Sequence, residues 1–337
     1  MITDAIAKLI SGASLSQAEA AATTREIMAG EATPAQIGAY LVALRMTGET
    51  PEEMAGMASV MRENAFRVEP NGDVIDIVGT GGDSVGPFNV STAASFVVAA
   101  AGIHVAKHGN RAMSGKMGSA DLLEALGVKM QLSPEGVNRC IGEVGIGFMF
   151  APAFHPATRH AAPVRRELGV RTVFNILGPL TNPAGAQYQL IGAANASTAE
   201  KIARVLAILG TKRSWVTAGD DGMDEITTTT TTSAWEVAGS KVRPFTISPE
   251  DAGISRAQVS DLQPATADDH VAMFHEALAP GTSPRKDLVL LSAGAAFAVT
   301  GRCADIRAGV ALAREQIDSG AAAAKVSDLA ALSKTLE

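Results

Sequence analysis

The chain has 337 residues, of which 47% are hydrophobic and 19% charged, and its formal net charge is −7 at pH 7. This length is enough to bury a large core in one or two domains, and the composition is ordinary for a soluble enzyme. The acidic balance argues against a general nucleic-acid binder. Two cysteines, Cys140 and Cys303, are too few for a disulfide framework or a Cys-based zinc site.

The sequence also lacks the features of a membrane or secreted protein. The longest apolar segment, Ser95–Ala106, is too short to span a bilayer, which takes roughly 20 apolar residues. No basic region followed by an apolar core begins the chain, so no secretory signal is visible. We therefore expect a cytoplasmic protein.

Residues 1–68 are predicted to form a small helical domain. Capping boxes, in which a Ser or Thr is followed three residues later by Glu or Gln, mark three helix starts. The pairs are Ser16 with Glu19, Thr33 with Gln36, and Thr50 with Glu53. No catalytic pattern is visible in this part of the chain.

Residues 72–337 are predicted to form a larger α/β domain, because short β-like runs alternate with helical stretches. The runs are Val74–Val78, Ile103–Ala106, Gly147–Phe150, Gln189–Gly192 and Trp215–Ala218, and the helices include Thr198–Leu209 and Ala304–Ser319. This alternation predicts a mostly parallel central sheet covered by helices on both faces. Ligands of such sheets bind beyond the carboxyl ends of the strands, where we expect the polar loops to converge.

The loop Lys107–Asp121 has the composition of an anion site. It holds three glycines, two serines, an asparagine and four side chains able to carry positive charge, and a short helix at Leu122–Gly127 follows it. Backbone N–H groups, hydroxyls and cations in a strand-to-helix loop favour phosphate. The alternative is that the glycines serve turn geometry alone. A Walker A loop is excluded, because five residues rather than four separate Gly109 from Gly115.

A second glycine-rich loop, Gly79–Asp83, follows the first predicted strand. Glycine allows the backbone to approach a ligand closely. Ser84 and Val85 exclude the dinucleotide-binding fingerprint, which needs a further glycine. The polar segment Phe88–Ala94 continues this loop into a predicted helix start, where the helix dipole favours anions.

An acidic cluster, Asp220–Glu225, follows the strand Trp215–Ala218. Carboxylates beside phosphate loops are suited to Mg²⁺ bridged to phosphate, although an acidic turn can also be merely solvated. The run Thr227–Thr232 after it is β-prone, and we expect an edge strand there with a structural role.

Four arginines lie within His155–Thr172, and one of them is a candidate for clamping a substrate carboxylate in bidentate fashion. We assign the other three to a solvent-facing helix. The turn-rich segment 175–185 is expected to pack near the helical domain as a hinge. The patterns of serine hydrolases and of zinc proteases are absent from the sequence.

Together these clusters, in this order and spacing, resemble the anthranilate phosphoribosyltransferase family over essentially the whole chain. The matching residues are Gly79–Asp83, Asn89–Thr92, Lys107–Arg111, Gly118–Asp121, Arg165, Asn175–Pro183 and Asp221–Glu225. The resemblance implies transfer of the 5-phosphoribosyl group from 5-phosphoribosyl 1-pyrophosphate (PRPP) to the amine of anthranilate, with release of pyrophosphate, in tryptophan biosynthesis. It also implies the nucleoside phosphorylase-like fold and a homodimer formed through the helical domain.

The resemblance further implies a set of site residues. The PRPP-binding residues would be Gly79, Gly82, Asp83, Asn89, Val90, Ser91, Thr92, Lys107, His108, Gly109, Asn110, Arg111, Ser114, Gly115 and Ser119. The anthranilate site would comprise Gly79, His108, Asn110 and Arg165. Two Mg²⁺ would bind at Ser91, Asp224 and Glu225, and no other catalytic group is implied beyond positioning and metal binding.

The chain departs from the family pattern at Pro87, where the family often has Thr, and at Gly115 and Met117, where small residues such as serine are common. Two alternatives remain open at this stage. A pyrimidine nucleoside phosphorylase shares the fold and a glycine-rich phosphate loop but does not need the Asp224–Glu225 pair. A non-catalytic relative that binds nucleic acid would require a basic face, which the acidic composition disfavours.

Overall fold

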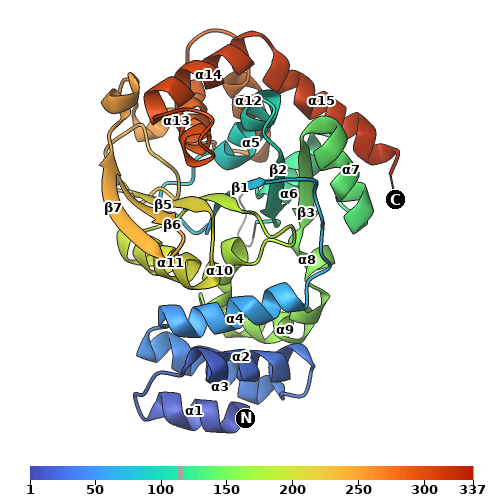
Figure 1. Cartoon of the computed structure of the whole chain (residues 1–337), viewed down its shortest axis with the longest axis vertical. Coiled ribbons are helices and arrows are strands. Elements are labelled where there is room, and N and C mark those ends of the chain that lie inside the picture. The colour runs from blue at the N-terminus through green and yellow to red at the C-terminus, as the bar shows by residue number, and fades with distance from the viewer. Residues whose placement is uncertain (113–116, 337) are drawn as a thin grey trace.

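The N-terminal part of the chain is a stack of four helices (Figure 1). The computed structural model describes residues 1–112 and 117–336. The four helices are α1 (Ile2–Ile10), α2 (Gln17–Met28), α3 (Pro34–Thr47) and α4 (Pro51–Glu63). All three predicted capping boxes are confirmed, with both reciprocal hydrogen bonds formed at the starts of α2, α3 and α4.

The rest of the described chain is built on a seven-stranded sheet with the order β3-β2-β1-β4-β5-β6-β7. The strands are β1 (Ile75–Gly79), β2 (Val105–Gly109), β3 (Ile146–Phe150), β4 (Tyr188–Gly192), β5 (Arg213–Gly219), β6 (Thr232–Ala238) and β7 (Lys241–Ile247). β1 to β5 run parallel to one another, whereas β6 and β7 add an antiparallel edge. The predicted fold class, a small helical domain with a larger α/β domain and a mostly parallel sheet, is confirmed.

Helices cover both faces of this sheet. The α-helices are α5 (Val90–Ala100), α6 (Ser119–Ala125), α7 (Pro134–Val144), α8 (Ala151–Phe154), α9 (Ala162–Leu168), α10 (Phe174–Leu177), α11 (Ala196–Leu209), α12 (Ala267–Ala277), α13 (Pro284–Val299), α14 (Ile306–Asp318) and α15 (Ala321–Lys334). Short 3₁₀ helices span Pro156–His160, Gly178–Leu180, Pro249–Ala252 and Val259–Asp261. None of the described helices is long and apolar enough to cross a membrane.

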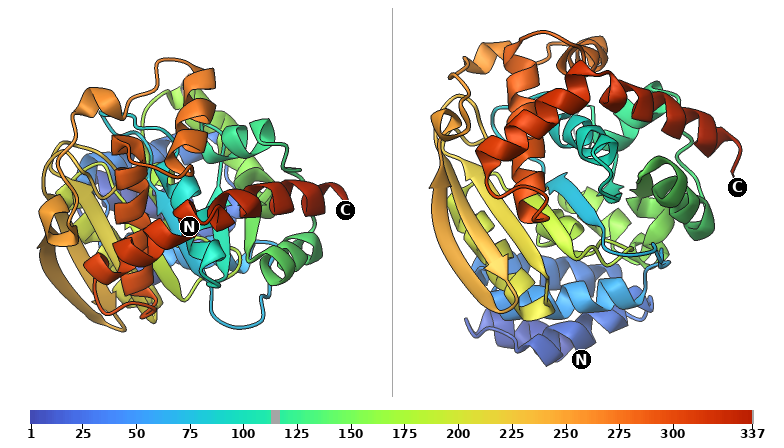
Figure 2. Two further views of the ribbon diagram at one scale, coloured as in Figure 1. Left: turned by 90° about the horizontal axis from the view of Figure 1, so that it is seen from above. Right: turned by 45° about the horizontal axis from the view of Figure 1, so that its top comes forward.

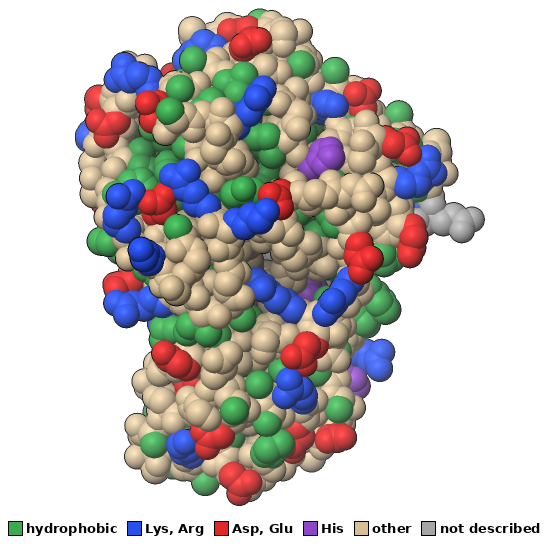
Figure 3. All heavy atoms as spheres, in the orientation of Figure 1, with side chains coloured by type: hydrophobic (Ala, Val, Ile, Leu, Met, Phe, Trp, Pro, Cys, Tyr) green, Lys and Arg blue, Asp and Glu red, His purple; other side chains and the backbone are tan. Residues whose placement is uncertain are grey.

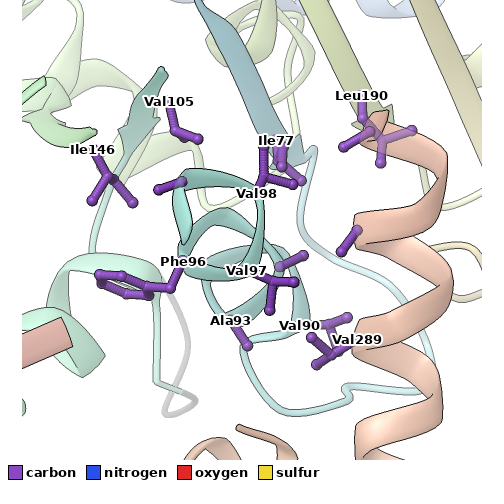
Figure 4. Packing of buried hydrophobic residues seen from close by; sticks show 14 of the residues in the cluster. Ile77, Val90, Ala93, Phe96, Val97, Val98, Val105, Ile146, Leu190 and Val289 are labelled. Atoms are coloured by element: carbon purple, nitrogen blue, oxygen red, sulfur yellow. The ribbon is translucent and has the colours of Figure 1, made fainter. Parts of the chain in front are cut away.

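The two faces of the sheet belong to different hydrophobic cores, because side chains alternate in direction along a strand. In β4, Leu190 packs with α5 and α13, and the next residue, Ile191, packs with α11 on the opposite face. Figure 4 shows the first core, in which Phe96 and Val97 of α5 lie below Ile77 of β1. Figures 1 and 2 show α5 and α12 to α15 on that side of the sheet.

The second core joins the N-terminal helices to the sheet. Tyr40 of α3 and Met57 of α4 belong to the same buried cluster as Leu206 of α11 and Ile191 of β4. The segment 175–185 takes part as well, because Leu180 is buried in this cluster and its carbonyl accepts a hydrogen bond of 2.7 Å from Arg62 Nε. The helical part therefore packs on one face of the sheet through α11 and this segment.

Two local predictions were wrong. β2 was expected to end at Ala106, but it continues through Lys107 and His108 to Gly109, because these residues pair with β3 and their side chains are buried. The run Thr227–Thr232 was expected to be an edge strand, but only Thr232 lies in β6. The preceding threonines form a loop, because their hydroxyls bond acidic side chains in competition with a sheet ladder.

Glu53 provides a test of how the helical part is held together. It is fully buried, and its two carboxylate oxygens accept N–H bonds of 2.7 Å from Leu15 and from Thr50. Glu53→Ala leaves both amides without these partners, so we expect a loss of about 2 kcal/mol in the free energy of unfolding.

The matched control is Glu52→Ala, one residue earlier on the exposed side of the same helical turn. It is expected to change the free energy of unfolding by no more than about 0.5 kcal/mol. Urea titrations of the two variants measure the difference. Equal urea midpoints would contradict the structural role given to Glu53.

Candidate active site

The carboxyl ends of β1, β4 and β5 lie side by side and end in glycine. Gly79 pairs with Gly192 across β1 and β4, and both face the turn that follows β5. A Cβ on Gly79 would lie 2.4 Å from Asp224 Oδ2, and one on Gly192 would lie 1.7 Å from the Asp224 carbonyl oxygen. Only glycine at these two positions lets the acidic turn rest on the strand ends.

The glycine-rich loop after β1 is bonded to this acidic turn. The Gly81 amide donates to Asp224 Oδ2 at 2.7 Å, and Gly81 and Gly82 both have positive φ. On the other side of the loop, Arg171 Nη2 donates to the Gly81 carbonyl oxygen at 3.0 Å. Asp83 closes the loop by accepting a 2.6 Å bond from the Gly86 amide.

Ser91, in the first turn of α5, connects three segments that are far apart in the sequence. Its amide donates to Glu225 Oε1 at 3.1 Å, and its hydroxyl accepts a 3.3 Å bond from Lys107 Nζ. Lys107 lies in β2, is 2% exposed, and also donates to the Ile77 carbonyl oxygen of β1 at 2.6 Å. Strands β1 and β2 and the turn that follows β5 therefore meet at the N-terminus of α5.

Burial disfavours the ionised forms of the acidic groups in this cluster. Burial, reinforced by the nearby Asp83 carboxylate, raises the pKa of Asp224 to about 6. Burial, reinforced by Asp224, raises the pKa of Glu225 to about 8. Burial lowers the pKa of Lys107, although Asp76 and Glu225 oppose that shift. Added positive charge here would stabilise the ionised carboxylates.

This donor set fits Mg²⁺. Carboxylate and hydroxyl oxygens are the ligands Mg²⁺ prefers, and it commonly uses one or two carboxylates together with substrate phosphates. Among the described residues, no group of three or more His, Cys, Asp and Glu side chains is arranged to hold a metal ion. A pair such as Asp224 and Glu225 therefore suits a metal that is shared with a phosphorylated ligand.

The start of α5 has features of an anion site. Asn89 is the N-cap residue, and its side-chain amide donates to the Met117 carbonyl oxygen at 2.9 Å. The Thr92 hydroxyl is buried and has no hydrogen-bond partner within the described part of the chain. Val90 places its side chain in the core, so only its backbone is available to a ligand. These groups lie beside the positive end of the helix dipole.

The end of β2 leads into the predicted phosphate loop. A Cβ on Gly109 would lie 2.2 Å from Ser119 Oγ, so this glycine permits a close approach to the start of α6. Asn110 is exposed, and its carbonyl oxygen accepts a 3.4 Å bond from Ser119 Oγ. Arg111 points toward α6 and forms ion pairs with Asp121 and Glu124 at 2.8 and 2.7 Å. Ser114 and Gly115 fall outside the described residues.

A second polar region lies on the side of β2 nearer the N-terminal helices. The rings of His108 and His155 are 5.0 Å apart, and each has a buried Nε2 without a partner among the described residues. Burial lowers the pKa of His108 to about 3 and that of His155 to about 4, so both rings are neutral at pH 7.

Arg165 of α9 is the fourth predicted residue of the acceptor site. Its guanidinium lies 5.0 Å from the centroid of the Phe174 ring, and no acidic side chain in the described residues pairs with it. Burial lowers its pKa. A half-buried guanidinium without a counter-ion is available to a carboxylate. In the orientation of Figure 1, Figure 3 shows a hollow at mid-height that is bordered by Lys and Arg side chains.

Four further residues at the site were not predicted from the sequence. Asp76 is fully buried, and it accepts bonds from the His108 amide at 3.3 Å and from Asn182 Nδ2 at 2.7 Å. His270 of α12 contacts Asn89 Oδ1 at 3.1 Å. Asp76 had a sequence signal, as an acidic residue within an apolar strand, and Asn182 lies in the segment Asn175–Pro183 that carries the resemblance. Asn182, His155 and His270 come close only through long-range packing.

Known proteins that are similar to this chain agree on one family. Residues 71–323 match the a/b domain of a glycosyl transferase family, and residues 3–65 match the helical bundle domain of the same family. Anthranilate phosphoribosyltransferase of Chloroflexus aurantiacus is 52% identical over 335 residues, covering 99% of each chain.

Solved structures give the same result. Anthranilate phosphoribosyltransferase of Thermus thermophilus superposes with a TM-score of 0.91 at 44% identity, over 98% of this chain and 99% of the other. The Saccharomyces cerevisiae enzyme in complex with PRPP and Mg has the same fold, with a TM-score of 0.91 at 24% identity over 99% and 98% of the two chains. The chain therefore belongs to the glycosyl transferase family with helical bundle and a/b domains and, within it, to the anthranilate phosphoribosyltransferases.

Proposed function

We propose that this site carries out the family's reaction, the transfer of 5-phosphoribose from PRPP to the amine of anthranilate, giving N-(5-phosphoribosyl)anthranilate and pyrophosphate in tryptophan biosynthesis. The observation that supports it most is the meeting of three segments at Ser91, which bonds both Lys107 and Glu225. A diphosphate bound at this point would face a helix N-terminus, a buried ammonium and a carboxylate pair suited to Mg²⁺.

PRPP is assigned to the loops around the start of α5. The residues that would hold it are Gly79, Gly82, Asp83, Asn89, Val90, Ser91, Thr92, Lys107, His108, Gly109, Asn110, Arg111, Ser114, Gly115 and Ser119. The unpartnered Thr92 hydroxyl and the positive φ of Gly82 support a ligand at this place. Arg111 would have to leave Asp121 and Glu124 to reach the ligand, so its contribution involves a change of rotamer.

Two Mg²⁺ are assigned to Ser91, Asp224 and Glu225. The raised pKa values of Asp224 and Glu225 support a cation at this point, because a cation would favour the ionised forms of both buried side chains. The yeast relative has been solved in complex with PRPP and Mg. When bound, Mg²⁺ supplies positive charge that stabilises the departing pyrophosphate.

The chain's own groups account for the rest of the chemistry. Breaking the bond between ribose C1 and pyrophosphate builds positive charge on the sugar, as in other glycosyl transfers. Lys107 and the amides at the start of α5 would stabilise the negative charge that develops on the leaving group. The aromatic amine is already a nucleophile, so no strong protein base is required. Positioning of the two substrates would supply most of the rate enhancement.

Anthranilate is assigned to the region of Gly79, His108, Asn110 and Arg165. The Arg165 guanidinium lacks an acidic partner in the described chain and would bind the substrate carboxylate. His108 and His155 are neutral, and their unpartnered Nε2 atoms offer hydrogen bonds to an uncharged amine. Because both rings are neutral, they would not repel the positive charge that builds on the sugar in the transition state.

Two alternative functions are less well supported. A pyrimidine nucleoside phosphorylase would use inorganic phosphate and would not need the carboxylate pair Asp224–Glu225. A non-catalytic relative that binds nucleic acid would require a basic face, and the net charge of −7 disfavours one.

We also propose how the chain is divided into moving domains and how it forms a dimer. Residues 1–68 and 72–337 would move as two domains about the segment 175–185, closing the site over both substrates. The helical part would mediate a homodimer, because α1 and α3 expose Ile10, Val42 and Met46 to solvent at 75%, 37% and 83%.

The proposed reaction has a direct test. Purified protein should consume anthranilate in the presence of PRPP and Mg²⁺, seen as loss of anthranilate fluorescence, and EDTA should abolish the reaction because the carboxylate pair then lacks its metal. Phosphorolysis of thymidine without any loss of anthranilate would instead support the phosphorylase. The yeast and bacterial relatives provide positive controls under the same conditions.

The carboxylate assignment is tested with Arg165→Ala. Removing the guanidinium should raise the KM for anthranilate roughly 10-fold to 100-fold and leave the KM for PRPP nearly unchanged, because only one substrate carries the carboxylate. Arg166→Ala is the matched control, since Arg166 is the exposed neighbour in the same helix. An unchanged KM for anthranilate in Arg165→Ala would refute the assignment.

The dimer is tested with Met46→Glu. Sedimentation equilibrium of the unaltered chain should give twice the monomer mass, and a charge placed on the apolar face of α3 should shift the protein toward the monomer. Glu31→Gln, an exposed change in the loop between α2 and α3, serves as the control. A monomeric unaltered chain, or a Met46→Glu variant that still dimerises, would exclude this interface.

A further inference from the structure

The six consecutive threonines Thr227–Thr232 lie directly after the acidic turn, and several of them hold its first two carboxylates. The hydroxyls of Thr227 and Thr229 both donate to Asp221 Oδ2, at 2.7 and 2.5 Å. Asp220 is held in the same way, by the hydroxyls of Thr231 and Ser233. The run thus surrounds two acidic side chains with hydroxyl donors rather than with cations.

The other oxygen of Asp221 is occupied inside the turn. Asp221 Oδ1 accepts the Met223 amide at 3.0 Å, and the Met223 carbonyl oxygen accepts the Gly219 amide at 2.9 Å. Both peptide groups of Met223 are therefore fixed, and its side chain is fully buried. Because Met223 directly precedes Asp224, this bonding fixes the backbone from which Asp224 and Glu225 project.

The threonine loop is itself rigidly bonded. The Thr229 amide donates to Thr227 Oγ1 at 3.0 Å, and the Thr227 amide donates to Thr232 Oγ1 at 3.1 Å. Ile226 lies between the carboxylate pair and the run, and it is 1% exposed. The pair Asp224–Glu225 is thus anchored on one side by Met223 and on the other by Ile226 and Thr227.

The acidic turn therefore divides into two kinds of carboxylate. Asp221 has hydroxyl or amide partners on both oxygens. Asp224 and Glu225 instead bond to other segments of the chain. The Gly81 amide donates to Asp224, and the Ser91 amide and the Ser292 hydroxyl donate to the two oxygens of Glu225. Burial raises the pKa of both side chains. Groups that orient metal ligands in this way commonly contribute about 10-fold to 100-fold to metal affinity or activity.

We propose that Asp221, held by the hydroxyls of Thr227 and Thr229, is a positioning residue that fixes the Asp224–Glu225 pair for Mg²⁺. Asp221 does not touch the metal. This inference rests on the proposed metal role of Asp224 and Glu225. With this role, the threonine run contributes to the reaction through Asp221. The threonines would have no such role if the acidic turn were only solvated and the run only an edge strand.

The test compares four variants by their binding of Mn²⁺, used as a probe for Mg²⁺, in the presence of pyrophosphate. Thr229→Val removes one hydroxyl with little change of shape, and Asp221→Asn removes the charge that the hydroxyls hold. Thr230→Val is the matched control, because its hydroxyl has no hydrogen bond to any described residue. Asp224→Asn marks the loss of a ligand. Electron paramagnetic resonance of free Mn²⁺ gives the dissociation constants, and thermal unfolding gives Tm.

Asp221→Asn should weaken Mn²⁺ binding about 10-fold or more, and Thr229→Val should weaken it several-fold. The KM for anthranilate should stay unchanged in Thr229→Val, and Thr230→Val should match the unaltered chain throughout. If Asp221→Asn does not fold, Thr229→Val decides the question alone.

Three outcomes distinguish the ways in which the inference could fail. Unchanged Mn²⁺ binding in Thr229→Val and Asp221→Asn, with weakened binding in Asp224→Asn, would overturn the positioning role and leave the metal site intact. Unchanged binding in Asp224→Asn would refute the metal role itself, and the inference would fall with it. A lowered Tm with an unchanged dissociation constant would show that the threonine bonds serve stability only.

Discussion

The bond between the Ser91 amide and Glu225 Oε1, 3.1 Å long, holds the proposed active site together. It ties the turn after β5 to the first turn of α5, and the Ser91 hydroxyl at the same time accepts Lys107 Nζ from β2. Burying an ammonium or a carboxylate without a partner costs desolvation free energy. Oppositely charged groups offset this cost for each other where helix amides complete their hydrogen bonds. This requirement places segments separated by more than a hundred residues at one point.

The backbone makes this convergence possible. Asp224 rests against Gly79 and Gly192 at the ends of two adjacent strands, where any side chain would collide with it. Asp76 of β1 and Asn182 of the loop before β4 bind the backbone of β2, through the His108 amide and the Ala106 carbonyl oxygen. The polar groups of the site therefore stand on a rigid support, as preorganised catalysis requires.

Local patterns allowed much of the fold to be predicted. The capping boxes at Ser16, Thr33 and Thr50 and the parallel strands at regular spacing depend on neighbours in sequence, and the structure confirms them. The loops that gather at the site were also visible as glycine-rich or acidic runs. Their specific roles remain proposals that rest on the geometry around Ser91.

Long-range contacts limited the prediction elsewhere. The composition of Lys107–Asp121 indicated a loop, but pairing with β3 makes Lys107 and His108 part of a buried strand. β-propensity indicated a strand at Thr227–Thr232, whereas hydrogen bonds to Asp221 bend most of it into a loop. His155 reaches His108 only through tertiary packing, which no local pattern encodes.

A crystal structure of the protein with Mn²⁺ and pyrophosphate, using the anomalous signal of the metal, would test most directly whether the segments around Ser91 form one site for metal and diphosphate. We expect two Mn²⁺ peaks beside Asp224 and Glu225, with pyrophosphate at the start of α5 and Asp221 still bonded to Thr227 and Thr229. A metal bound by Asp221 instead, or pyrophosphate bound away from Ser91 and Lys107, would refute this arrangement.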